Sequence, residues 1–380
     1  MTSSRLKRVE ESATIRISNI ANRMIKEGTD VINFSLGEPD FNTPKNICDA
    51  AAKAMYEGKT HYAPSAGIPE LRAAIAEKLR TENNLDVTEA GVLVTPGAKQ
   101  GIFEIMMGVL DDGDEAILFD PAWVTYDACI RFAGAETVWV PTVPEKGFIP
   151  DDFADYITDK TKLIVVNSPG NPTGGVFGKK TLQCIADLAI DHDLTVVSDE
   201  IYEKTVYERE HISIGSFDGM QERTITVNGF SKAYAMTGWR LGYLTAPPEI
   251  LKLLLKIQSH SVSSATTFVQ YGGLEALQGP QDSVKAMVDR FKVRRDVLVD
   301  GLNKMGLECK KPDGAFYAFA NVSEYGNGTE VAEMLLREAQ VAVTPGIAFG
   351  SSGENFIRVS YATSIDRIRE ALERLEKIFL

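Results

Sequence analysis

The sequence predicts an α/β protein whose larger part is a mostly parallel sheet with helices on both faces. Between about residues 44 and 246, short apolar runs rich in β-branched residues alternate with amphipathic helical stretches. Strands that are buried on both faces have this composition, and the helices between them serve as crossovers between parallel neighbours. A different pattern follows residue 248 and predicts a smaller α+β domain.

The elements of the larger part follow one another closely. Helical spacing over residues 71–79 is followed by a strand over 91–95, and Pro96-Gly97 separates that strand from a helix over 99–110. Five more apolar runs predict strands at residues 115–119, 137–140, 163–167, 195–199 and 224–228. The pattern by itself therefore indicates six strands.

The rest of the chain is expected to form the smaller domain. A long helical region covers about 248–303, with Gly272-Gly273 and Gly279-Pro280 as interruptions. After it, strands and helices are predicted at 316–319, 331–338, 341–343, 356–360 and 364–379. A helix over 15–27 is expected to pack against this domain. We expect the chain to divide into 1–43 as part of the small domain, 44–275 as the large domain and 276–380 as the small C-terminal domain.

Composition and charge restrict the partners. The chain has 380 residues and a formal net charge of −13, so nucleic acid or an anionic membrane surface would be repelled. No apolar stretch is long enough to span a membrane and no signal-peptide core is present, so we expect a cytoplasmic protein. The cysteines and histidines lack the spacing of a metal site or a disulfide framework: Cys48, Cys129, Cys184, Cys309, His61, His192, His211 and His260.

Lys232 is the candidate for covalent chemistry. It follows the strand 224–228 in a loop of Gly, Ser and Ala residues, where a cofactor can approach the backbone. A buried lysine amine can form a Schiff base with a carbonyl compound, whereas most lysines at a strand end are solvated surface charges. The surrounding sequence decides between the two interpretations.

Polar residues after other strands complete the requirements of a pyridoxal phosphate site. Such a site needs an amine, a carboxylate on the ring nitrogen, donors to the ring oxygen and an anchor for the phosphate. Asp199 ends an apolar strand and is a candidate for the carboxylate, although a helix N-cap is an equal alternative. Tyr202 and Asn171 are candidate donors, and Trp123 could stack on the ring. Taken singly, each of these three is more often a core or turn residue.

Two further groups could bind anions. The turn Gly97-Ala98-Lys99 opens a helix directly after a strand, so its free N–H groups could receive a phosphate, with help from Ser231 and Arg240. Arg358 lies in a strand-like run, where a charge is costly unless it is paired. It could clamp a substrate carboxylate or form a structural ion pair.

Five short segments, considered together with their order and spacing along the chain, carry a resemblance to a known family. They are Gly37-Glu38-Pro39-Asp40-Phe41, Tyr62-Ala63-Pro64, Asn171-Pro172-Thr173-Gly174, Asp199-Glu200-Ile201-Tyr202 and Lys232 to Arg240. Over nearly its whole length the chain resembles the class I aminotransferases of pyridoxal-phosphate fold type I. The likeness is greatest to their bacterial and archaeal aspartate aminotransferase branch. The resemblance implies a mostly parallel sheet of seven strands and a smaller α+β domain.

The resemblance also implies roles for the candidate residues. Lys232 would bind pyridoxal 5′-phosphate covalently and then shuttle a proton, while Asp199, Tyr202 and Asn171 would contact the ring and Trp123 would stack on it. The α-carboxylate of the substrate would be bound by Arg358, aided by Asn171 and the Gly37 backbone. Tyr62 would reach the phosphate in the neighbouring subunit, which implies a homodimer with shared active sites.

Two departures from the family pattern bear on the substrate. Gly229 stands where many relatives have a phosphate-binding serine, and residues 256–268 contain no arginine for the distal carboxylate of the substrate. In the branch that the chain resembles, residues matching Lys99, Ser12 and Thr14 serve that carboxylate instead, which favours aspartate with 2-oxoglutarate. Glu10 and Glu11 lie where prephenate-using members have a basic residue, so prephenate is disfavoured.

Three other functions share the core residues. An aminotransferase for aromatic or a broad range of amino acids would differ only in the side-chain pocket. A β-eliminating lyase has the same fold, and so does a non-catalytic regulator that binds pyridoxal phosphate and DNA. The acidic chain shows no DNA-binding module before residue 15, which argues against the regulator.

Overall fold

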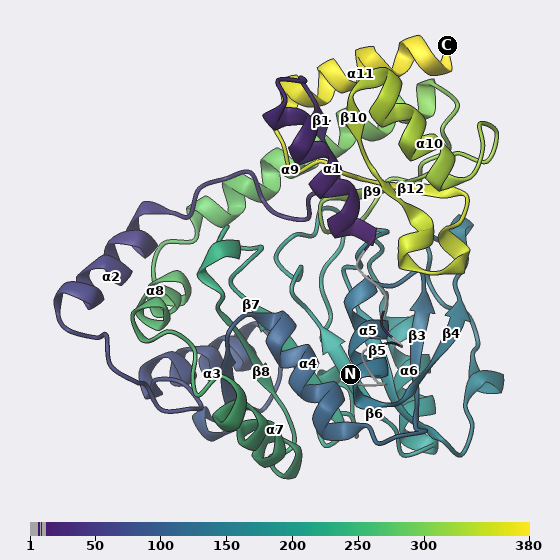
Figure 1. Ribbon diagram of the computed structural model, residues 1–380. Coiled ribbons are helices and arrows are strands. Elements are labelled where there is room, and N and C mark those ends of the chain that lie inside the picture. Colours follow the sequence, from purple (N-terminus) through teal and green to yellow (C-terminus); the bar gives the residue numbers. More distant parts are fainter. Residues whose placement is uncertain (1–6, 8, 10–12) are drawn as a thin grey trace.

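A seven-stranded sheet forms the centre of the larger domain (Figure 1). The computed structural model describes residues 7, 9 and 13–380. The strand order is β2-β8-β7-β6-β5-β3-β4. The strands are β2 (Val92–Thr95), β3 (Glu115–Asp120), β4 (Glu136–Pro141), β5 (Thr161–Asn167), β6 (Thr195–Asp199), β7 (Thr224–Gly229) and β8 (Gly242–Thr245). The predicted α/β class and mostly parallel sheet are confirmed.

Helices cover both faces of this sheet because successive strand residues point to opposite sides. Leu163 and Val165 of β5 pack with α4 (Ala98–Val109), α5 (Val124–Ala133) and α7 (Pro248–Ser261). Ile164 and Val166 pack on the other face with α6 (Lys179–Asp191). Each fully buried aliphatic side chain contributes about 1.5–3 kcal/mol relative to an exposed one. At one end of the sheet, β2 packs with α3 (Pro69–Asn83) and α8 (Thr267–Gln278).

The strand β8 was missed by the sequence pattern. It has only four residues and directly follows the loop that carries Lys232 and Arg240. It runs antiparallel to both of its neighbours, β2 and β7, so no crossover helix marks it. Its Gly242 lies against the start of α4, where an added Cβ would come within 2.4 Å of the Ala98 nitrogen.

The long helical region is three helices, interrupted at the expected Gly279-Pro280 but not at Gly272-Gly273. The first break falls at residues 262–266, between α7 and α8, and the second at Gly279, before α9 (Asp282–Lys304). Gly272 and Gly273 lie inside α8 and do not interrupt it. Added Cβ atoms there would approach Trp239 to 2.8 Å and Leu241 to 2.5 Å, so these glycines allow close packing.

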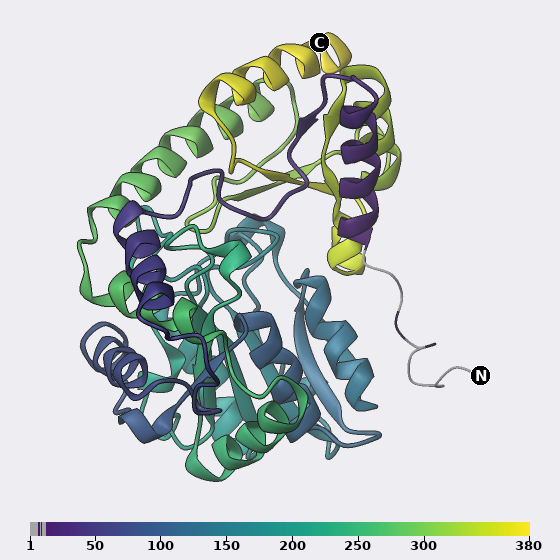
Figure 2. The ribbon, with the colours of Figure 1, turned by 60° about the vertical axis from the view of Figure 1, so that its left-hand side comes forward.

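The smaller unit combines the two ends of the chain (Figure 2). An antiparallel sheet is formed by β11 (Thr344–Pro345), β12 (Phe356–Ser360) and β9 (Tyr317–Asn321). The N-terminal strand β1 (Ile32–Asn33) pairs in parallel with β10 (Val341–Ala342), and α1 (Ala13–Lys26) contacts β10 and β11. The other helical elements of this unit include α10 (Gly328–Met334), the π-helical turn Leu335–Ala339 and α11 (Ile365–Phe379), whereas α2 (Lys45–Tyr56) packs with α8 of the larger domain.

These pairings accord with an N-terminal segment that belongs to the small domain. The division at residues 43/44 and 275/276 remains a prediction. Within residues 7, 9 and 13–380, no helix is both long and apolar enough to cross a membrane.

Candidate active site

A cavity of about 460 Å³ opens at the carboxyl ends of β5, β6 and β7. Four cations line it, namely Lys99, Lys232, Arg240 and Arg358. Among the described residues that line it, Asp199 is the one carboxylate. In a chain with a net charge of −13, this local excess of positive charge marks a site for anionic ligands. The volume is that of a pocket for a cofactor or small substrate.

Lys232 reaches the pocket from the loop after β7. Its Nζ donates a hydrogen bond to the carbonyl oxygen of Gly37 at 2.6 Å and lies 5.9 Å from the centre of the Tyr202 ring. Burial lowers the pKa of the amine to about 8, and the charges of Arg358, Arg240 and Lys99 add to this effect, while Glu38 opposes it. A neutral amine is therefore available near neutral pH, as a nucleophile or base requires.

Asp199 lies at the end of the central strand β6 and is buried. Its Oδ2 accepts a hydrogen bond from the Tyr126 hydroxyl at 2.7 Å and its Oδ1 accepts one from the Ile201 amide at 3.1 Å. Burial raises the pKa of this carboxyl to about 6 despite these hydrogen bonds. Residues 201–204 form a turn, so Asp199 does not begin a helix, and the N-cap interpretation is wrong.

Tyr202 and Asn171 both line the pocket. The Tyr202 hydroxyl hydrogen-bonds to the Tyr317 hydroxyl at 2.7 Å, and burial raises the pKa of Tyr202. Asn171 Oδ1 accepts a hydrogen bond from Arg358 at 3.0 Å. Both side chains are thus held by neighbours at the pocket wall, where a ligand oxygen could meet them.

Arg358 enters the pocket from β12 and is only 3% exposed. Its guanidinium donates to Asn171, to the Ser35 carbonyl oxygen at 2.7 Å and to the Thr344 hydroxyl at 3.3 Å, while its Nε has no hydrogen-bond partner. No ion pair joins it to a carboxylate in the described part of the chain, so the structural ion-pair interpretation finds no support. A buried charge of this kind is stabilised by an anionic ligand.

The start of α4 faces Arg240. Gly97 precedes the helix with a φ of +87°, a conformation that favours glycine, and an added Cβ would lie 2.6 Å from Arg240 Nη2. Arg240 also donates to the Thr237 carbonyl oxygen at 2.9 Å. Ala98, Lys99, Ser231 and Arg240 line one end of the pocket, where the free N–H groups of the first helical turn can receive a phosphate.

Trp123 lies at the start of α5, beside the pocket. Its ring makes an edge contact with Tyr126 at 5.3 Å between centroids, and the Lys99 Nζ lies 4.9 Å from its centre. Lys99 is exposed to the open pocket, and partial burial still lowers the pKa of its amine. Lys99 and Trp123 thus lie together at the pocket wall.

Some predicted residues lie elsewhere. Tyr62 is 91% exposed and lies at a separate surface hollow, so its predicted role in the neighbouring subunit stays a prediction. Ser12, Glu10 and Glu11 lie outside the described residues, and Thr14 is in the first turn of α1. Gly37, in contrast, lines the pocket together with Lys232, as predicted for a residue that contacts the substrate.

The sequence pattern missed several pocket residues. Tyr126, which binds Asp199, is one helical turn along from Trp123, and Asn167 follows the same end-of-strand rule as Asp199. The Asn167 side chain donates to the Asp199 carbonyl oxygen at 3.0 Å and accepts from the Asn171 amide at 2.9 Å. No sequence pattern marks Tyr317 and Asn19 as pocket residues, because only the folded chain brings them to the pocket.

Residues 29–375 match the profile of the family "Aminotransferase class I and II", and the chain therefore belongs to this family. It is an aminotransferase. At 45% identity, it is similar to the aspartate/prephenate aminotransferase of Thermus thermophilus over 99% of this chain and 98% of that protein. It is also 45% identical to the probable aspartate aminotransferase of Methanocaldococcus jannaschii over the full length of both. The solved Thermus thermophilus aspartate aminotransferase with maleate superposes with a TM-score of 0.95 at 44% identity, covering 100% of this chain and 99% of that one.

Proposed function

We propose that this aminotransferase uses pyridoxal 5′-phosphate to transfer the amino group of aspartate to 2-oxoglutarate. Two half-reactions would account for it, in which aspartate leaves as its 2-oxo acid and 2-oxoglutarate leaves as glutamate. The observation that carries the proposal is the set of four cations around one carboxylate in the pocket. The charges suit one phosphate and a substrate with two carboxylates.

The residues present fit the cofactor. The Gly97 turn and Arg240 form a cradle that a Cβ at position 97 would fill, which suits a phosphate. Asp199, buried between Tyr126 and the Ile201 amide, suits a protonated ring nitrogen. When bound, pyridoxal phosphate supplies an electrophilic carbon for amines and an electron-withdrawing ring. Trp123, from the start of α5, is available to cover that ring.

Proton movement is assigned to Lys232. With its pKa lowered to about 8, the amine can take a proton from the α-carbon of the substrate and return it at a neighbouring atom. Gly37 holds the amine by its carbonyl oxygen at 2.6 Å, which orients it toward the pocket. General acid–base help of this kind is typically worth about 10² to 10⁴ in rate.

Substrate selection is assigned to Arg358 and Lys99. Arg358, without a carboxylate partner of its own, would bind the α-carboxylate that all amino acid substrates share. If Arg240 and the α4 terminus take the phosphate, Lys99 remains for the distal carboxylate. Aspartate and 2-oxoglutarate both carry that second carboxylate. Ser12 and Thr14 keep their predicted part in the same subsite.

The active unit is proposed to be a cytoplasmic homodimer. Tyr62 is almost fully exposed and lies outside the pocket of its own chain, which supports a role in the site of a second copy. A mass measurement in solution, with Tyr62→Phe tested for weaker cofactor binding, checks this part of the proposal.

An aromatic amino acid substrate is an alternative that the name of one relative supports. The chain is 41% identical to a protein named aromatic-amino-acid aminotransferase 2 of Thermococcus litoralis. The deciding experiment compares kcat/KM for aspartate, phenylalanine and leucine with 2-oxoglutarate as acceptor, and for glutamate with oxaloacetate or prephenate. Aspartate should exceed phenylalanine by at least about tenfold, since one charged contact is worth about 1.5–3 kcal/mol. A higher value for phenylalanine would favour the aromatic enzyme.

A further inference from the structure

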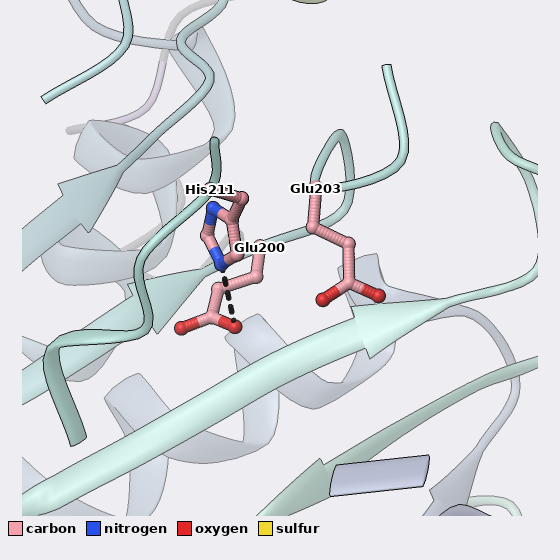
Figure 3. A group of neighbouring side chains, drawn as sticks. All are labelled: Glu200, Glu203 and His211. Atoms are coloured by element: carbon pink, nitrogen blue, oxygen red, sulfur yellow. Dashed lines mark ion pairs between the residues drawn. The ribbon is translucent and has the colours of Figure 1, made fainter. Parts of the chain in front are cut away.

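A buried charged network lies behind the pocket, on the other side of the segment that carries Asp199. Figure 3 shows three of its members, with the His211 imidazole directed at the Glu200 carboxylate. The His211 Nε2 and Glu200 Oε2 atoms are 3.0 Å apart, and the Glu200 side chain is completely buried. The proposed function uses none of these groups.

Every oxygen of the two carboxylates in the network has a partner. Glu200 Oε1 accepts hydrogen bonds from Ser198 at 2.9 Å and Ser213 at 2.6 Å. Asn83 Nδ2 donates to Glu200 Oε2 at 2.9 Å and to Glu203 Oε2 at 2.8 Å, so it bridges the two carboxylates. Glu203 Oε1 is paired with Lys78.

The charges balance when His211 is protonated. Glu200 and Glu203 then carry two negative charges, and Lys78 and His211 carry two positive ones. Burial lowers the pKa of His211, but the nearby Glu200 and Glu203 charges outweigh this effect and raise it overall. Opposite charges that balance and pair in this way are buried at a lower cost than isolated charges, although the His211 Nδ1 atom has no hydrogen-bond partner.

This set does not suit a metal ion, although the ligand atoms of Glu200, Glu203 and His211 lie within 4.8 Å of one another. The Lys78 ammonium already contacts Glu203 and donates to Asn83 Oδ1 at 2.7 Å. A cation at the centre would therefore compete with a buried charge that the fold supplies itself. The network therefore has a role other than metal binding.

The segment after β6 has two faces. Asp199, Ile201 and Tyr202 line the pocket, whereas Ser198, Glu200 and Glu203 point into the network. On the pocket side, each functional group has few restraints: Asp199 has the Tyr126 hydroxyl and the Ile201 amide, and Tyr202 has the Tyr317 hydroxyl. The side chains that hold this segment in place therefore lie on the opposite face from Asp199 and Tyr202, the residues proposed to contact the cofactor.

We propose that Glu200, Glu203 and His211, held by Lys78 and Asn83, are positioning residues that fix Asp199 and Tyr202 from behind. The network ties the segment to α3 through Lys78 and Asn83, and to the loop 205–213 through His211 and Ser213. The main chain between Ser198 and Glu203 cannot shift without breaking several buried hydrogen bonds. Asp199 and Tyr202 are therefore presented to the ring in one arrangement, as outer-shell partners do for other ligands.

The inference rests on the proposed cofactor, and its test separates the two. Wild-type protein and the Glu200→Gln and His211→Gln variants are stripped of cofactor and titrated with pyridoxal phosphate. Dissociation constants come from absorbance, and visible circular dichroism at saturation reports the orientation of the bound ring. Glu210→Gln is the matched control, since Glu210 is exposed and adjoins His211. Urea unfolding of each cofactor-free protein measures its stability.

Both network variants should bind the cofactor on the order of tenfold more weakly and show an altered visible dichroism at saturation, whereas Glu210→Gln matches wild type. Loss of stability with unchanged affinity and dichroism would make the network purely structural and overturn the inference. No visible band in wild-type protein would instead refute the proposed function. If a network variant does not fold, Ser213→Ala removes a single hydrogen bond and should give a smaller change of the same kind.

Discussion

Arg358 Nη1 donates a hydrogen bond to Asn171 Oδ1 across 3.0 Å, and this contact joins β12 to the loop that follows β5. The residue proposed to bind the substrate carboxylate therefore touches a residue proposed to contact the cofactor ring. In the predicted division the two residues belong to different domains, so this hydrogen bond links the large domain to the small one.

Arg358→Lys should lower kcat/KM by about a hundredfold for every amino acid substrate. Lysine keeps the charge but cannot form the two-pronged contact with a carboxylate. Losing one side of a buried charged pair costs about 2–5 kcal/mol, and about 2.7 kcal/mol corresponds to a hundredfold. Steady-state kinetics with aspartate and with phenylalanine measure this, and Arg337→Lys, at an exposed arginine, is the control. A loss confined to aspartate would place the side-chain carboxylate, not the α-carboxylate, at Arg358.

Lys99→Ala should discriminate between substrates. If Lys99 binds the distal carboxylate, kcat/KM for aspartate should fall about ten- to a hundredfold, because a hydrogen bond to a charged group is worth about 1.5–3 kcal/mol. Phenylalanine, which lacks that carboxylate, should change by less than about threefold and serves as the internal control. Equal losses for both substrates would assign Lys99 to the cofactor phosphate.

The rate of cofactor capture should depend on pH through Lys232. Only the neutral amine attacks a carbonyl, and its pKa is lowered to about 8 from the 10.5 of an ordinary lysine. The second-order rate constant for pyridoxal phosphate should therefore rise about tenfold per pH unit below 8 and level off above it. Stopped-flow absorbance measures this rate. A rate still rising steeply at about pH 10 would mean that the amine is not perturbed.

Stability should fall with rising pH through His211. The folded state raises the pKa of His211 above its ordinary value of 6.5, since the pull of Glu200 and Glu203 outweighs the effect of burial. The contribution of this group is therefore fully present below about pH 6.5 and is lost as pH rises through the folded pKa. Urea unfolding of cofactor-free protein at about pH 6, 7 and 8 should show the decline. His211→Gln should make the decline shallower without abolishing it, because burial also raises the pKa of Glu104 to about 7, whereas His192→Gln, at an exposed histidine, should leave the decline unchanged.

The sequence predicts well those parts that obey local rules. The strand ends at Asn167 and Asp199 and the glycine turn before α4 were recognisable because buried strands followed by polar residues have a clear pattern. The four-residue β8 was not, since its pairing depends on β2 and β7, which lie far apart along the chain. The same holds for the network behind Asp199, where Lys78, Asn83 and His211 come together only in the folded protein.

Helix boundaries show the same limit. The sequence predicts a break at Gly272 and Gly273 because glycine is unfavourable within helices, yet packing against Trp239 and Leu241 overrides that preference. For Arg358 the sequence leaves two interpretations, a clamp for a substrate carboxylate and a structural ion pair. Its neighbours Ser35, Asn171 and Thr344, which lie far apart in the sequence, favour the clamp.

Lys232 is proposed to move the proton during amino transfer with pyridoxal phosphate, and one spectroscopic measurement tests this role most directly. Protein loaded with the cofactor is mixed with aspartate alone, and then with 2-oxoglutarate, while its visible absorbance is recorded. We expect the visible band to fall with aspartate and to return with 2-oxoglutarate, and Lys232→Ala to respond at least about 10²-fold more slowly. A visible band that does not change when aspartate is added, or a Lys232→Ala variant that responds at the wild-type rate, would contradict this role of Lys232.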